Sequence, residues 1–99
     1  MVNKIAQKAL ECAIKRGKIT PVAPAYEVLR RQKRAVHDEA VELLVAKYSR
    51  QSSHIPAYTE DEEEAAYVVI AALNYLHIAT ADAMSVIEAK MNYNETRED

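Results

Sequence analysis

The sequence predicts an all-α fold, and the prediction rests on three features of its composition. The 99 residues include one glycine and three prolines, which leaves few residues for the tight turns that join β-strands. Tyrosine is the only aromatic type, and the helix-favouring residues Ala, Glu, Leu, Lys and Arg are abundant. Apolar residues make up 49% of the chain and recur at helical spacing. We therefore expect one helical domain that covers residues 1–99.

The first two helices are expected on either side of a proline-containing linker. Apolar residues at helical spacing predict a helix over residues 3–16, and Gly17 supplies a left-handed stop. Two prolines then make residues 18–24 a linker. A second helix is expected from residue 24 or 25 to about residue 48. Its apolar stripe is expected to consist of Tyr26, Leu29, Val36, Ala40, Leu43 and Leu44.

Two further helices are expected in the second half of the chain. Residues 50–58 are expected to form a loop, and Thr59 followed by Glu62 has the pattern of a capping box that starts a helix. This third helix is expected to end near residue 78. Thr80 is expected to cap the fourth helix, which has Asp82 in its first turn and ends near residue 97.

The third helix carries almost no polar face. Between residues 65 and 76 only Asn74 and two tyrosine hydroxyls are polar. A helix that is apolar on all sides has to be covered on all sides, and the other three helices of a short chain do not suffice for that. We therefore expect a homodimer or a tetramer with this helix near the shared core. Asn74 is expected to be either a buried amide bonded to the partner chain or a nucleotide contact.

Charge and cysteine content limit the function and the compartment. A net charge of −2 and a pI near 5.9 oppose a general nucleic-acid binder. The single cysteine, Cys12, excludes an intrachain disulfide, favours a reducing cytoplasm and is expected in the core. The first residues lack the apolar stretch of a secretory signal, and residues 65–76 form an apolar run too short to span a membrane. We therefore expect a cytoplasmic protein.

Three glutamates are candidates for a metal site. Glu39 and Glu42 are three residues apart on one side of the second helix, next to apolar positions. Glu64 stands at the start of the third helix. Carboxylates beside apolar surface need a cation, and three of them from two helices can form an oxygen-ligand site for Mg²⁺ or Mn²⁺. The alternative is structural, because an acidic run such as residues 60–63 also stabilises a helix N-terminus without any ligand.

A second set of polar residues follows in the last helix. Lys90, Asn94 and Arg97 are spaced by four and three residues, which places them on one helix face. On a helical wheel they continue the core-facing line that Ala83 and Ile87 begin. A cation, an amide and a guanidinium in this arrangement can bind phosphates and a base.

The order of these features resembles the MazG-like nucleotide pyrophosphohydrolases, the all-α NTP pyrophosphatases. In that family an ExxE on one helix and an ExxD on the next hold Mg²⁺, and a KxxxNxxR pattern follows on the last helix. The matching stretches here are DEAVE (38–42), EEAAY (63–67) and KMNYNETR (90–97). The N-terminal AQKALECAIKRGK is similar to the first helix of small, phage-like members.

The resemblance implies a four-helix bundle that is completed by homo-oligomerisation. It implies hydrolysis of a nucleoside triphosphate to the monophosphate and pyrophosphate. Glu39, Glu42 and Glu64 would hold Mg²⁺, and Glu39 or Glu42 would also act as the catalytic base that orients the water. The substrate would be bound by Lys90, Asn94 and Arg97.

One position departs from the family pattern. Tyr67 stands where the ExxD motif ends in aspartate, and a tyrosine hydroxyl with a pKa near ~10 is a poor Mg²⁺ ligand. Asp61 does not replace it, because it lies outside the helix on the cap, and Asp38 is not expected to be a ligand, because the helical wheel points its side chain away from Glu39. Two hypotheses therefore stay open. One is an active enzyme with altered metal use, and the other is a non-catalytic module of the same fold that binds nucleotide or a protein partner.

Overall fold

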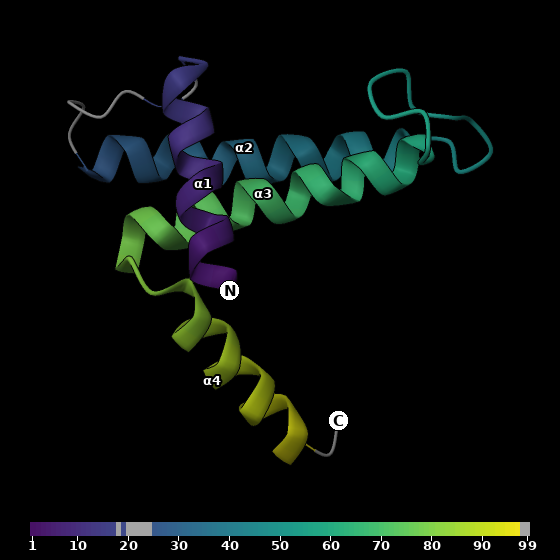
Figure 1. Cartoon of the computed structure of the whole chain (residues 1–99). Coiled ribbons are helices and arrows are strands. Elements are labelled where there is room, and N and C mark those ends of the chain that lie inside the picture. Colours follow the sequence, from purple (N-terminus) through teal and green to yellow (C-terminus); the bar gives the residue numbers. More distant parts are fainter. Residues whose placement is uncertain (18, 20–24, 98–99) are drawn as a thin grey trace.

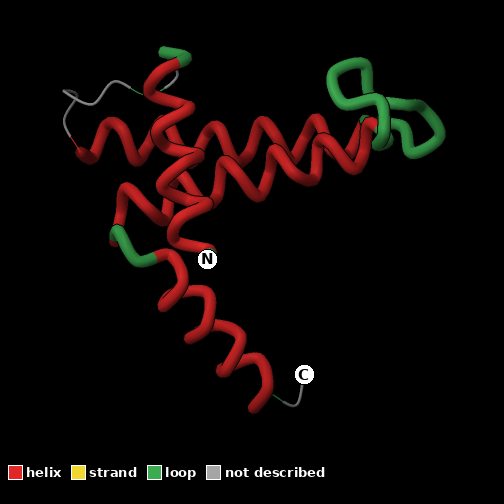
Figure 2. Tube along the Cα trace, in the orientation of Figure 1, coloured by secondary structure: helices red, strands yellow, loops and turns green. Residues whose placement is uncertain are grey.

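The computed structural model describes residues 1–17, 19 and 25–97, and these residues form four α-helices and no strand (Figures 1 and 2). The helices are α1 (Val2–Lys15), α2 (Ala25–Val45), α3 (Glu60–Thr80) and α4 (Ala83–Thr96). The predicted all-α class is therefore confirmed. The expected linker over residues 18–24 lies outside the described residues, except for Ile19.

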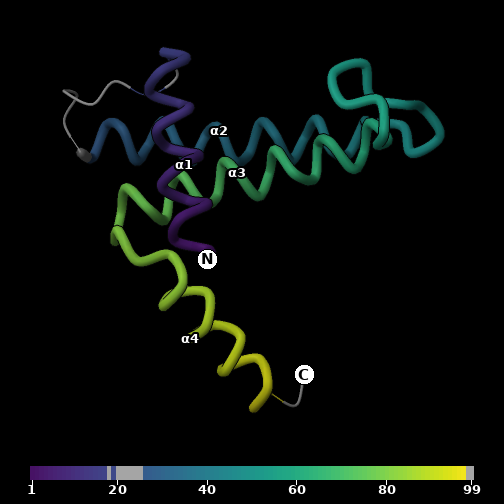
Figure 3. Tube along the Cα trace, in the orientation of Figure 1, coloured from purple at the N-terminus to yellow at the C-terminus, as the bar shows by residue number. Residues whose placement is uncertain are grey.

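The helices have unequal roles in the arrangement. α2 and α3 run antiparallel and side by side, and the loop of residues 46–59 joins them (Figure 3). α1 packs on α3 and on α4, whereas no packing joins α1 to α2 or α2 to α4 within the described residues. After α3 ends, the chain bends and α4 extends away from the other helices (Figure 1).

Local chemistry explains the helix ends that the sequence predicted correctly. Gly17 has a φ of 75°, so it provides the left-handed stop after α1. At the start of α3 the capping box is complete: Thr59 N–H donates to Glu62 Oε1 at 2.9 Å, and Glu62 N–H donates to Thr59 Oγ1 at 3.4 Å. The end of α2 differs, since this helix stops at Val45 rather than near residue 48.

The predicted cap of α4 is wrong. Thr80 is the last residue of α3, and its Oγ1 accepts a hydrogen bond from Asp82 N–H at 2.7 Å. The N-cap is Asp82, whose Oδ1 accepts from Ser85 N–H at 3.2 Å. Between them Ala81 has a φ of 61°, a left-handed conformation that ends α3 two residues later than predicted.

The core lies where α1, α3 and α4 meet. Ala6, Leu73 and Ala83 are buried there, and the two alanines let the helices approach closely. Asn3 fixes the same junction, because its Nδ2 donates to Asp82 Oδ1 at 2.9 Å. Its Oδ1 accepts from the backbone N–H of Met84 at 2.8 Å. The first turn of α1 therefore holds the start of α4.

Much apolar surface stays uncovered in the single chain. Val69 and Ile70 of α3 are 56% and 40% exposed. As the sequence predicts, the other helices of one chain therefore leave part of this helix uncovered. Tyr26 and Leu44, which were predicted in the apolar stripe of α2, are exposed, and Cys12 is exposed rather than in the core.

Within the described part of the chain, no single helix is long and apolar enough to cross a membrane. α3 and α4 pass that length and composition test only together, and a bend of 108° separates them.

Candidate metal centre

A cavity of about 830 Å³ lies between α1 and α2, over α3. It forms because α3 packs on both helices while α1 and α2 do not pack on each other. Its volume is within the roughly 300–1,000 Å³ that is usual for small-molecule sites. One wall is α1 from Ile5 onward together with its C-cap Arg16, and the opposite wall includes Val28 and Gln32 of α2. Gln32 also joins α2 to α3, since its Nε2 donates to the carbonyl oxygen of Ala71 at 3.2 Å.

The three predicted glutamates meet at this cavity. Glu39 and Glu42 come from successive turns of α2, and Glu64 comes from the start of α3. One carboxylate oxygen of each lies within 4.8 Å of the other two. The i, i+3 spacing brings the first pair together, and the antiparallel packing of α2 on α3 brings Glu64 to them. Asp38 also lines the cavity but does not belong to this group of three.

The electrostatics of the cluster are unfavourable without a cation. Burial, and then the charge of Glu42, raise the pKa of both Glu39 and Glu64 above its ordinary value. Glu39 Oε2 and Glu64 Oε2 are shielded from solvent and have no hydrogen-bond partner in the part of the chain that the structure describes. Among the described residues, no lysine or arginine forms an ion pair with any of the three. Hard carboxylate oxygens of this kind fit Mg²⁺ or Mn²⁺, whose charge would offset the repulsion.

Tyr67 and Asn74 line the same cavity on α3. Tyr67 stands one turn after Glu64 and lines the cavity, so a phenol rather than a fourth carboxylate occupies this position. Asn74 is 5% exposed, and its Oδ1 has no hydrogen-bond partner among the described residues. The expectation that Asn74 is buried is therefore confirmed, and its oxygen is available to a donor on a ligand.

The predicted substrate-binding residues lie elsewhere in the chain. Lys90 and Asn94 of α4 and its C-cap Arg97 are exposed, and none of them lines the cavity. They belong to the end of the chain where α4 extends away from the core (Figure 1). The core-facing line that begins at Ala83 ends at the half-buried Ile87. Instead, Lys90 Nζ lies 4.7 Å from the Tyr93 ring centroid, and Arg97 Nη1 donates to Asn94 Oδ1 at 3.3 Å.

Several residues at the cavity were not predicted from the sequence. Lys8 and Arg16 line it from α1, and Arg31, which also pairs with Glu27, lines it from α2. The spacing of Lys8 and Arg16 by eight residues places both on the α1 face that carries Cys12, a pattern that is readable from the sequence. His54, from the loop between α2 and α3, has no such pattern.

Comparison with family models, with curated proteins and with solved structures finds no match to this chain.

Proposed function

We propose that the protein is a Mg²⁺-dependent nucleoside triphosphate pyrophosphohydrolase in which Glu39, Glu42 and Glu64 hold the metal, with Mn²⁺ as a substitute. The observation that supports this proposal is the convergence of three carboxylates from two helices at a cavity of about 830 Å³, where no lysine or arginine of the described residues forms an ion pair with them. The ordered likeness to the MazG-like pattern supplies the reaction class.

The residues around the cavity fit a polyphosphate ligand beside the metal. When bound, Mg²⁺ would polarise phosphate oxygens and lower the pKa of a coordinated water. Lys8 and Arg16 of α1 would offset phosphate charge from the opposite wall. Asn74 Oδ1 would accept a hydrogen bond from the ligand. Water would attack the α-phosphorus, and pyrophosphate would leave.

We also propose that the active form is a homodimer or a tetramer, located in the cytoplasm. The chain exposes 7534 Å², whereas a compact monomer of 11.1 kDa exposes roughly 5,700 Å². The excess of about 1,900 Å² is what one partner contributes to a large obligate interface. The radius of gyration of 14.9 Å also exceeds the roughly 13 Å of a compact domain of this size.

In this assembly Lys90, Asn94 and Arg97 of one copy would serve the cavity of another copy. The two parts are complementary in charge, since the acidic cluster would hold the metal and the α4 residues would bind phosphates. Mixing a Glu64→Gln variant with a Lys90→Ala variant tests this arrangement. Partial recovery of activity in the mixture is expected, and a mixture that exchanges subunits but stays as inactive as its components would contradict it.

The central experiment measures hydrolysis of a panel of NTPs and dNTPs with Mg²⁺ and with Mn²⁺. Chromatography separates monophosphate from diphosphate, so the products identify the bond that breaks. Glu42→Gln is expected to abolish monophosphate formation, whereas Glu88→Gln, an exposed acid on α4, is expected to leave it unchanged. Formation of diphosphate and orthophosphate, or activity that persists in Glu42→Gln, would contradict the proposal.

The alternative is a non-catalytic module of the same fold that binds nucleotide or a protein partner. Tyr67, at the place of a fourth carboxylate, favours it. Comparing Tyr67→Asp with Tyr67→Phe separates the two functions, because only the first adds a metal ligand. Hydrolysis by the unmodified protein supports the enzyme. Nucleotide binding without hydrolysis, with activity appearing only in Tyr67→Asp, supports the module.

A further inference from the structure

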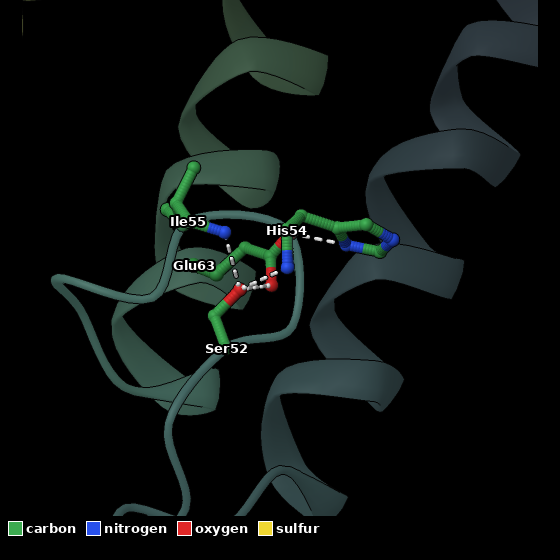
Figure 4. A network of polar contacts seen from close by, with 4 residues as sticks. All are labelled: Ser52, His54, Ile55 and Glu63. Carbon is green, nitrogen blue, oxygen red and sulfur yellow. Dashed lines mark hydrogen bonds and ion pairs between the residues drawn. The ribbon is translucent and has the colours of Figure 1, made fainter.

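The loop between α2 and α3 is organised around Ser52, which is 2% exposed (Figure 4). Its Oγ accepts hydrogen bonds from the backbone N–H of His54 at 3.1 Å and of Ile55 at 3.0 Å. The same hydroxyl donates to Glu63 Oε1 at 2.5 Å. Three contacts on one buried hydroxyl therefore fix residues 52–55 against the first turn of α3.

Glu63 also holds the ring of His54. His54 Nδ1 lies 3.0 Å from Glu63 Oε2, and the Glu63 side chain is only 12% exposed (Figure 4). Ser52 already donates to Oε1 of the same carboxylate, and an ionised carboxylate only accepts hydrogen bonds. Nδ1 must then carry the proton. In the neutral ring this leaves an unprotonated Nε2, which is the nitrogen that Glu63 does not occupy.

His54 lines the same cavity as the three glutamates. The other groups on the cavity wall are less suited to accept a proton from water. Lys8 and Arg16 are cations, and the amides of Gln32 and Asn74 are not bases at neutral pH. The three clustered carboxylates would be occupied by the metal. Asp38 is 63% exposed, and its contact is with His37, which is 75% exposed, rather than with a buried group.

We propose that His54 is the general base of the hydrolysis and that Glu63 is its positioning residue. This inference rests on the proposed function. Nε2 takes a proton from water while the water oxygen forms a bond to the α-phosphorus. The bond from that phosphorus to the bridging oxygen breaks, and its electron pair leaves with pyrophosphate. Ser52 and Glu63 keep the Nδ1–H oriented, so the ring meets the water without reorganisation.

The geometry is tested first, independently of any activity. Nitrogen NMR of the histidine rings in the full chain distinguishes a ring protonated at Nδ1 from one protonated at Nε2. His54 is expected to show the Nδ1–H form, and Glu63→Ala is expected to shift it toward the Nε2–H form while His37 and His77 stay unchanged. An Nε2–H form in the unmodified protein, or no response to Glu63→Ala, overturns the positioning role.

The catalytic role is tested with His54→Gln. The His54 side chain is 76% exposed, so the variant is expected to fold. We expect kcat to fall by roughly 10²–10⁴-fold, as is typical for loss of a general base, with KM and the Mn²⁺ affinity from electron paramagnetic resonance unchanged. His37→Gln, at an exposed histidine of α2 outside the cavity, is the matched control.

The outcomes separate this inference from the proposed function. Hydrolysis by the unmodified protein that persists in His54→Gln overturns the role of His54 alone. A loss of kcat together with an equal loss of Mn²⁺ affinity also overturns it, because His54 would then support the metal site. Absence of hydrolysis in the unmodified protein overturns the proposed function and the general base with it.

Discussion

Replacing Glu64 with glutamine is expected to stabilise the metal-free protein and to abolish its stabilisation by divalent metal. A carboxylate oxygen of Glu64 lies within 4.8 Å of oxygens of Glu39 and Glu42. The pKa of Glu39 and of Glu64 is raised, first by burial and then by Glu42. The carboxyl groups of Glu39 and Glu64 therefore bind a proton more tightly in the folded state than in the unfolded state. Ionised carboxylates destabilise the fold above the raised pKa, and this cost is lost as the pH falls through it.

The magnitude follows from the separation of the charges. Two unit charges about 4.8 Å apart repel by ~1 kcal/mol in a water-like dielectric. Glutamine keeps the size of the side chain and removes two such pairs, and salt screens part of the gain. A net stabilisation of ~1 kcal/mol raises the Tm of a chain of this length by roughly 4–8 °C. For the unmodified protein, metal at about 100 times its Kd is expected to add ~2.7 kcal/mol, which the variant loses.

The assay is thermal unfolding by circular dichroism near neutral pH, with EDTA or with Mg²⁺ or Mn²⁺. The chain concentration is held constant, because oligomerisation also shifts the Tm. Glu88→Gln removes an exposed acid of α4 and is expected to behave as the unmodified protein in both conditions. Two results would refute the reasoning. They are a Tm of the EDTA-treated Glu64→Gln variant at or below that of the unmodified protein, and a Tm of the unmodified protein that does not respond to metal.

Three further predictions concern residues outside the cluster. Ala81→Gly is expected to raise the unfolding free energy by ~1 kcal/mol in urea titrations, because Ala81 has a φ of 61°; a lower stability would contradict this. Asp82→Ala is expected to lower the urea midpoint. Hydrogen bonds from Asn3 and Ser85 lower the pKa of Asp82 in the folded state. The stabilising contribution of Asp82 is therefore present above its pKa in the unfolded state and is lost as the pH falls through its pKa in the folded state. The two proteins should therefore converge in acid, and a constant difference would contradict the assignment. Cys12 is exposed at the cavity, so a maleimide is expected to label it in the native state, and bound nucleotide with Mg²⁺ is expected to slow the labelling.

Helix ends were predictable where the chemistry is local. The capping box needs only Thr59 and a residue three positions later, so its sequence pattern was sufficient. The junction of α3 and α4 was not predictable in this way, because Thr80 and Asp82 are both good capping residues. Asn3 favours Asp82, and it does so from 79 positions away in the chain. A side chain at the start of α1 therefore helps to decide where α4 begins.

The same distinction separates the two parts of the candidate site. Glu39 and Glu42 share a helix face by spacing alone, and Glu64 joins them once α2 and α3 pack as an antiparallel pair. The pairing of His54 with Glu63 depends on the turn that Ser52 holds, and no periodicity describes the conformation of such a loop. From the sequence, Glu63 is therefore predicted only as a charge that complements the helix dipole.

Helical periodicity states which residues of α4 share a face, but it does not state where the helix goes. Lys90 and Asn94 share a face of α4 and Arg97 is its C-cap, yet α4 leaves the core after Ile87, so within one chain the acidic cluster and these three residues stay apart. The surface area in excess of a compact monomer gives a physical reason to place a second copy against this chain. The proposed assembly requires a contact that places α4 of one copy at the cavity of another. Activity in the mixture of Glu64→Gln and Lys90→Ala depends on this contact, because neither chain alone carries both parts.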